Sequence, residues 1–288
     1  MKRLFSIPKI ILLLLLTAGV LSAQTNGALA DNAALRYWSA FSVLQDVALT
    51  TQQAKELTAI LDGTAPYDDS KYKDLLEKNA LALEIMARGA SLPKCDWGLD
   101  YSLGPELPAE YSRKALALGR LNVLYSLHLF KTGNKNAGVR ALVSGLQFSR
   151  DSANGGTLFA TILAKELLID HLRAIGGILH LENLSAAQKM QLAKAVDKLG
   201  VHGVDWQSAI KREMQLLNRP PWQANVPLAQ VTKAYVAAFQ DTSQLSNLQQ
   251  VLTTVPQPLR EVIPGPTEII PQQTELDQHL AQIRSLLQ

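Results

Sequence analysis

The amino-acid sequence predicts an all-α fold, in which antiparallel helical hairpins stack as a bundle or as a short helical-repeat array. Alanine, leucine and glutamine dominate and runs of β-branched residues are scarce, which favours helix over strand. Apolar residues recur at helical spacing, as in Tyr37, Phe41, Leu44 and Ala48. The turns between the longest such segments are short, and short turns make consecutive helices antiparallel neighbours.

Capping residues and apolar spacing place the individual helices along the chain. Asp31, Thr51 and Asp69 are suitable N-caps for the first three. The helix at 157–180 is apolar on most of its circumference, which is typical of a buried central helix. The full set of expected helices is 32–49, 51–62, 70–89, 109–131, 135–153, 157–180, 185–199, 206–219, 228–240, 243–253 and 274–287.

The segment 109–153 predicts one helical hairpin of the stack. Gly138 and Gly145 lie seven residues apart on its second helix, so two helix backbones can approach closely there. The hairpin is similar to a tetratricopeptide repeat, whose second helix also carries small residues seven apart, over ~34 residues. It lacks the aromatic positions of that family, and Arg150 and Asp151 stand where its terminal proline would be. The resemblance therefore predicts architecture only.

The first 23 residues predict a secretory signal peptide. Lys2, Arg3 and Lys9 form a basic region, an apolar run follows at 10–21, and a small residue, Ala23, ends the segment. The apolar run is shorter than the ~20 residues that a bilayer crossing needs. We therefore expect cleavage after Ala23, export to the periplasm or outside the cell, and no stable membrane insertion afterwards. An uncleaved membrane anchor is the alternative.

The charge balance argues against nucleic acid as a partner. Three of the 28 basic residues and none of the 25 acidic ones lie in 1–23, so the rest of the chain has 25 of each. Nucleic-acid-binding proteins usually carry a basic patch or a high pI. Cys95 is the only cysteine and cannot close an internal disulfide, so we expect a buried thiol and a fold stabilised by its hydrophobic core.

The chain is expected to divide into the signal peptide, an α-helical domain at 24–253 and a C-terminal part at 254–288. The C-terminal part begins with five prolines between 254 and 272, which predict a stiff, extended segment before the terminal helix. Inside the helical domain, residues 90–108 combine helix breakers with apolar side chains. This combination predicts an ordered connector that packs on the helices.

The connector contains the main candidate site. Asp96 and Asp100 alternate with Trp97 and Tyr101, and carboxylates beside aromatic rings can hold a sugar or support acid–base hydrolysis. The alternative is a structural connector, with rings packed on the helices and carboxylates capping turns. Trp222, in a proline-rich turn, is a second candidate that either faces a partner or folds inward.

No catalytic residues, cofactor or metal site are predicted. The chain has no G-x-S-x-G elbow, phosphate loop or dinucleotide fingerprint. Its histidines do not form the paired spacings of helical zinc or di-iron sites. His128 and His171 each fall among apolar residues at helical spacing, and we expect both to be core histidines with satisfied hydrogen bonds.

Three short segments resemble a group of uncharacterised exported bacterial helical proteins. They are Tyr37-Trp38-Ser39-Ala40-Phe41, Cys95-Asp96-Trp97-Gly98-Leu99-Asp100-Tyr101 and Gly104-Pro105-Glu106-Leu107-Pro108, which precedes a long helix. The resemblance covers about residues 32–180. It implies export and an α-helical fold, and it implies no activity.

These observations together predict an exported, non-enzymatic helical scaffold of the cell envelope whose partner is another envelope protein or a peptide. The alternative is an envelope hydrolase or carbohydrate-binding protein that uses the loop 95–101. Replacing Asp96 and Asp100 by asparagine separates the two, because a hydrolytic or glycan-binding signal that survives both changes excludes that loop as the site.

Overall fold

The computed structural model describes residues 31–45, 49–106, 110–154, 156–218 and 228–288. Within these ranges the regular secondary structure is helical and no β-strand is present, which confirms the all-α prediction. The predicted signal peptide at 1–23 and the candidate residue Trp222 lie outside the described residues.

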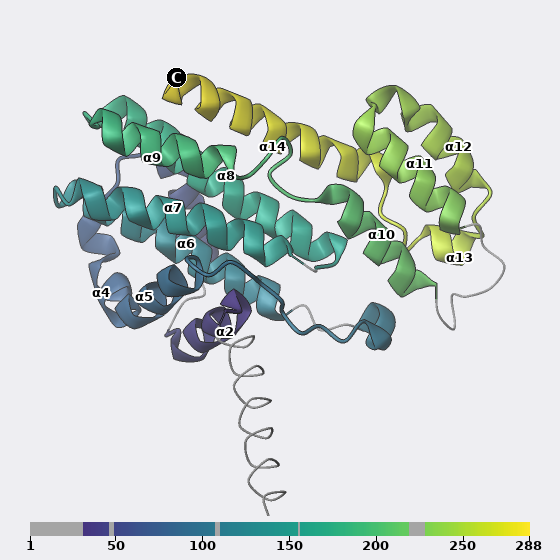
Figure 1. The fold of residues 1–288 in the computed structure, drawn as a ribbon, viewed down its shortest axis with the longest axis horizontal. Helices are drawn as coiled ribbons and strands as arrows, with labels where there is room; N and C mark the ends of the chain where they lie inside the picture. Colours follow the sequence, from purple (N-terminus) through teal and green to yellow (C-terminus); the bar gives the residue numbers. More distant parts are fainter. Residues whose placement is uncertain (1–30, 46–48, 107–109, 155, 219–227) are drawn as a thin grey trace, which may run out of the picture.

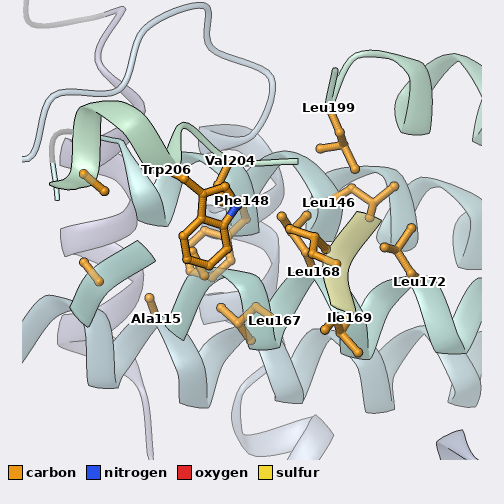
Figure 2. Packing of buried hydrophobic residues seen from close by; sticks show 14 of the residues in the cluster. Ala115, Leu146, Phe148, Leu167, Leu168, Ile169, Leu172, Leu199, Val204 and Trp206 are labelled. Atoms are coloured by element: carbon orange, nitrogen blue, oxygen red, sulfur yellow. The ribbon is translucent and has the colours of Figure 1, made fainter. Parts of the chain in front are cut away.

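Three long helices form the centre of the molecule (Figure 1). They are α6 (Glu110–Lys131), α7 (Lys135–Ala153) and α8 (Leu158–Leu181), and each packs against the other two. Their observed bounds agree with the predicted ones to within a residue, and α8 is the buried helix that its apolar pattern predicts. Side chains from α7 and α8 meet Trp206 and Val204 in this core, and Figure 2 shows Phe148, Leu167 and Leu168 among them.

The N-terminal helices form a layer beside this centre. In this layer α2 packs on α5, α5 packs on α7, and α3 packs on α8. The helices are α2 (Ala33–Val43), α3 (Thr51–Leu61), α4 (Lys73–Lys78) and α5 (Ala80–Gly89), with a 3-10 turn at Asp69–Lys71.

The prediction of one helix at 70–89 is wrong, because the chain breaks at Asn79. The buried Asn79 amide accepts a hydrogen bond from the backbone nitrogen of Gln45 at 2.8 Å and donates to the Gln45 carbonyl oxygen at 2.9 Å. Its backbone, at φ −107° and ψ 11°, leaves the helical region, so α4 and α5 are separate helices.

The C-terminal helices cover the other side of the centre. α14 lies along α8 and α9 (Figure 1), and α10, α11 and α12 pack in succession beside them. These helices are α9 (Ala186–Asp197), α10 (Trp206–Leu217), α11 (Leu228–Gln240), α12 (Leu245–Thr253), α13 (Gln257–Arg260) and α14 (Pro266–Leu287), and a 3-10 turn at Thr242–Gln244 precedes α12.

The prediction of an extended segment at 254–272 is also wrong, because α13 lies inside it and α14 starts at Pro266. Pro266 occupies the first turn of α14, where a backbone amide has no intrahelical partner to lose. Pro271 lies further inside the helix and is solvent-exposed. The apolar stripe of α14, which buries Ile269, Leu276 and Leu280, offsets the hydrogen bond that Pro271 cannot make.

A glycine allows the three central helices to approach closely. A Cβ atom at Gly145 on α7 would overlap the His171 imidazole on α8 and the Asn122 amide on α6. A Cβ atom at Gly138 would lie 2.7 Å from the ring of Phe130. Both glycines of the predicted pair therefore lie where helices meet without space for a larger residue.

The two histidines that were expected in the core differ. His171 is fully buried: its Nδ1 donates to the Leu167 carbonyl oxygen at 2.7 Å, and its Nε2 accepts from the Asn122 amide at 3.1 Å. For His128 the prediction is wrong, because the ring is only half-buried and its Nδ1 lies 2.5 Å from Oδ1 of Asp69. Helical spacing placed His128 among apolar residues, whereas the 3-10 turn at Asp69–Lys71 brings a carboxylate to it.

Gly145→Ala is expected to lower the free energy of unfolding by about 2 kcal/mol or more, because the new methyl group has no room between α6 and α8. Gly177→Ala on α8 is the matched control, since a Cβ there meets nothing within 4 Å. Because alanine has a higher helix propensity than glycine, this control is expected to leave the free energy of unfolding unchanged or to raise it by up to about 1 kcal/mol. Urea unfolding followed by circular dichroism measures both, and equal effects would contradict the close approach.

His171 is expected to make the protein less stable as the pH falls below neutral. Burial lowers the pKa of His171 from 6.5 to about 4, so below pH 6.5 the unfolded chain binds a proton that the folded state does not. Its contribution is complete above pH 6.5, and about 2 kcal/mol is lost between pH 6.5 and pH 5. Unfolding of the wild type and of His171→Gln at several pH values isolates this effect, because the buried carboxyl groups titrate alike in both. Parallel pH dependences would show that His171 carries no such effect.

Candidate functional site

The connector that contains the candidate residues is fastened to the N-terminus of α2. The Asn32 side chain donates to the Asp96 carbonyl oxygen and accepts from the Asp96 amide, both at 2.8 Å. The Ala33 amide donates to the Lys94 carbonyl oxygen at 2.7 Å. These bonds fix the backbone at the start of the loop 95–101.

Asp151, near the end of α7, holds the other side of the connector. Its carboxylate accepts from the Tyr37 hydroxyl at 2.7 Å and from the Gln147 amide at 2.8 Å. Its carbonyl oxygen accepts from Nε1 of Trp97 at 2.8 Å, and the Cys95 thiol points to the same oxygen at 3.7 Å. Burial raises the pKa of the Asp151 carboxyl group, and the hydrogen bonds from Tyr37 and Gln147 oppose that rise.

Trp97 is the centre of an aromatic cluster. Its ring centroid lies 4.5 Å from that of Tyr111, 5.7 Å from that of Tyr37 and 5.9 Å from that of Phe41, with which it is stacked. Trp97 is buried, so its ring joins the connector to α2 and α6 and is not presented to solvent.

The two aspartates of the loop cap its turns. Oδ1 of Asp96 accepts from the Gly98 amide at 3.0 Å, and Oδ1 of Asp100 accepts from the Ser102 amide at 2.8 Å. Gly98 has a φ of +64°, which the turn requires. The Tyr101 ring is half-buried, and the guanidinium of Arg212 on α10 lies 5.9 Å from its centroid. The structure thus brings Asp96, Trp97, Asp100 and Tyr101 into one short segment, with Trp97 directed into the core.

The Cys95 thiol, within the connector, is partly buried. Burial raises the pKa of this thiol, and the nearby carboxylates of Asp151 and Asp96 raise it further. The surroundings therefore favour the protonated thiol, whose sulfur lies against the Asp151 carbonyl oxygen at the end of α7.

A concave surface lies along the C-terminal half of α8, and the sequence did not predict it. We name it the α8 groove: the space of about 860 Å³ between α8, α14 and the loop that follows α3. Its walls are mostly apolar and include Leu61, Leu127, Leu172 and Ile283. Gly176 and Gly177 leave its floor on α8 without side chains, and Leu181 at its end is 84% exposed.

Few charges line the α8 groove. Arg173 is paired with Asp62 at 3.4 Å, and the other titratable side chains are His180, His279 and the Tyr67 phenol. Burial, reinforced by the positive charge of Arg173, lowers the pKa of His279. The one signal in the sequence was the Gly176-Gly177 pair, because two adjacent glycines lower the helix propensity inside a long helical segment.

The described part of the chain contains no group of three or more histidine, cysteine, aspartate or glutamate side chains that could hold a metal ion. None of its helices combines the length and the apolar character needed to cross a membrane.

Comparison of this chain with protein-family models, with curated proteins and with solved structures finds no match.

Asp151→Ala is expected to lower the free energy of unfolding by about 2–3 kcal/mol, because it leaves the buried Tyr37 hydroxyl and the Gln147 amide without their acceptor. Asp96→Ala, which removes an exposed turn cap, is expected to cost less than about 1 kcal/mol. Chemical denaturation of both variants tests this ranking. A larger loss for Asp96→Ala would show that the loop 95–101, rather than Asp151, holds the connector in place.

Proposed function

We propose that this protein is an exported, non-enzymatic helical scaffold of the cell envelope that binds a short amphipathic helical segment of another envelope protein. The observation that carries the proposal is the α8 groove, an apolar concave surface of about 860 Å³ with an exposed leucine, Leu181, at its end. Large exposed apolar surfaces of this kind mark interaction sites. Export rests on the basic residues and the apolar run in 1–23.

The dimensions of the groove favour a helix as its occupant. The part of α8 that lines it, from Leu172 to Leu181, is about 15 Å long, which matches two to three turns of a second helix. A helix seated in such a groove inserts apolar anchors at positions i, i+3 or i+4, and i+7. At Gly177 nothing lies within 4 Å of the position that a Cβ atom would take, so the partner backbone can come close to α8 there, whereas Ile283 packs against Gly176.

The charges around the groove favour an occupant whose polar face is neutral or acidic. The single carboxylate on its walls, Asp62, is already paired with Arg173. The remaining titratable side chains on its walls are His180, His279 and Tyr67, and none of them attracts a cationic side chain. An amphipathic segment rich in lysine would therefore gain less here than one that carries glutamate.

The alternative, a hydrolase or carbohydrate-binding protein that uses the loop 95–101, has less support. The Asp96 and Asp100 carboxylates each accept a backbone amide within their own turn, and the Trp97 ring is buried. A sugar site needs an accessible ring face. Of the four loop residues, Tyr101 alone offers a half-exposed ring, and Arg212 lies over it.

Short peptides selected from a display library on the wild-type protein are expected to share apolar residues at helical spacing and to bind the α8 groove. Gly177→Phe fills the floor and Leu181→Lys places a charge at the rim, so each is expected to weaken binding by about tenfold or more. Leu181 is so exposed that its replacement leaves folding unaffected. Leu81→Lys, at an exposed leucine of α5 away from the groove, is the matched control.

Fluorescence anisotropy of the labelled peptides measures these affinities. Peptides without helical spacing, or peptides that bind the Leu181→Lys and Leu81→Lys variants equally well, would refute the groove as the binding site. A photoreactive residue at position 181 in the native cell envelope then identifies the natural partner, provided that the same residue at position 81 does not capture it.

A further inference from the structure

A second cavity lies on the side of the connector that faces α10, and we name it the cationic cleft. It has a volume of about 820 Å³, within the range of sites for small molecules. Its walls come from the connector at 93–95, the end of α7 at 150–154, the loop 198–205 and the first turns of α10. It is separate from the α8 groove and shares no lining residue with it.

Four permanently charged cations line the cleft, one from each of its walls. They are Lys94 on the connector, Arg150 on α7, Lys198 on the loop after α9, and Arg212 on α10. Among the described residues none of the four forms an ion pair, although Lys135, Arg120 and Arg173 elsewhere are each paired with a carboxylate. Arg212 instead lies over the Tyr101 ring, and Arg150 donates to the Lys198 carbonyl oxygen at 3.0 Å.

The acidic groups of the cleft are already engaged inside the protein. The Asp151 carboxylate is buried and accepts from Tyr37 and Gln147. Asp205 caps α10, where it accepts from the Ser208 amide at 2.9 Å and from the Ser208 hydroxyl at 2.6 Å. The lining of the cleft therefore carries four cations against two carboxylates, both engaged in internal hydrogen bonds, which makes its potential positive.

The wall formed by the loop 198–205 is held in place by α14. Arg284 donates to the Gly200 carbonyl oxygen, and Gly203, at a φ of +70°, packs directly against Leu276. The His202 imidazole turns toward α14, where its Nδ1 lies 2.9 Å from Oδ2 of Asp277. Because these contacts fix the backbone of the loop, the wall that carries Lys198 is in place before any ligand arrives, which reduces the entropy cost of binding.

We propose that the cationic cleft binds a small organic anion that carries two or more phosphate or carboxylate groups. Cations on four separate walls can meet such groups from different sides, whereas a neutral sugar or a cationic ligand would leave them unpaired. Arginine suits phosphate and carboxylate through its forked donors, and lysine adds a mobile charge at the exposed positions 94 and 198.

Isothermal titration calorimetry of the full chain with two probes, pyrophosphate and citrate, tests this inference. The double variant Lys94→Gln/Lys198→Gln removes two exposed charges from the cleft without touching the core. The control Lys114→Gln/Lys189→Gln removes two exposed charges outside the cleft, so its net charge equals that of the cleft variant. The cleft variant is expected to bind the preferred probe about tenfold more weakly, and the control is expected to bind like the wild type.

Each outcome of these titrations either supports the inference or overturns it. Binding of pyrophosphate alone supports a phosphorylated ligand, binding of citrate alone supports a polycarboxylate, and binding of both supports the shared anionic chemistry. The inference is overturned if the wild type binds neither probe, or if the two double variants lose affinity equally. The Leu181→Lys variant of the α8 groove retains anion binding if the two sites are distinct, so failure here leaves the proposed groove function untouched.

Discussion

The close approach of α6, α7 and α8 around Gly145 is the constraint on which the rest of the structure depends. Only a residue without a side chain lets Asn122 of α6 reach both the Ala141 carbonyl oxygen, at 3.0 Å, and the ring of His171. Because this polar contact is fully buried, its hydrogen bonds must all be made, which fixes the rotation of each helix about its axis. That rotation turns Asp151 toward Tyr37 and the connector, and it turns the bare glycines of α8 toward the groove.

The position of α14 depends on α8 in turn. Lys165 on α8 has a side chain that is only 2% exposed, and a buried ammonium group is tolerated only where it is paired. Its Nζ lies 2.5 Å from Oε2 of Glu275 and 2.9 Å from Oε1 of Gln272, both on α14. The same helix buries Leu276, Leu280 and Ile283 against the core. An ion pair that requires both helices thus gives α14 a defined register along α8.

The sequence predicted those features that depend on neighbouring residues, and it missed those that depend on distant ones. The bounds of α6, α7 and α8 followed from apolar spacing and glycine-containing turns, and both are local signals. The break at Asn79 and the Asp69 partner of His128 arise from contacts with residues 34 and 59 positions away, so no local pattern announces them. The prolines of 254–272 gave a local signal for extended chain that the packing of α14 overrides. For the loop 95–101 the sequence left two interpretations open, and Asp151, 54 residues from Trp97, shows how the ring is held.

The α8 groove and the cationic cleft share α14 as a structural element. His279 and Ile283 line the groove, while Arg284 and Leu276 of the same helix hold the loop that forms one wall of the cleft. Lys165 holds α14 in register with α8. Because packed interiors do not deform continuously, α14 cannot shift beside the groove without also shifting beside the loop 198–205. A ligand that changes the position of α14 from one side therefore changes the geometry on the other, and by linkage any such coupling acts equally in both directions. The partner proposed for the groove would contact α14 directly, and the anion proposed for the cleft would contact the loop 198–205 that α14 holds. The placement of α14 is therefore the physical basis on which one can influence the other.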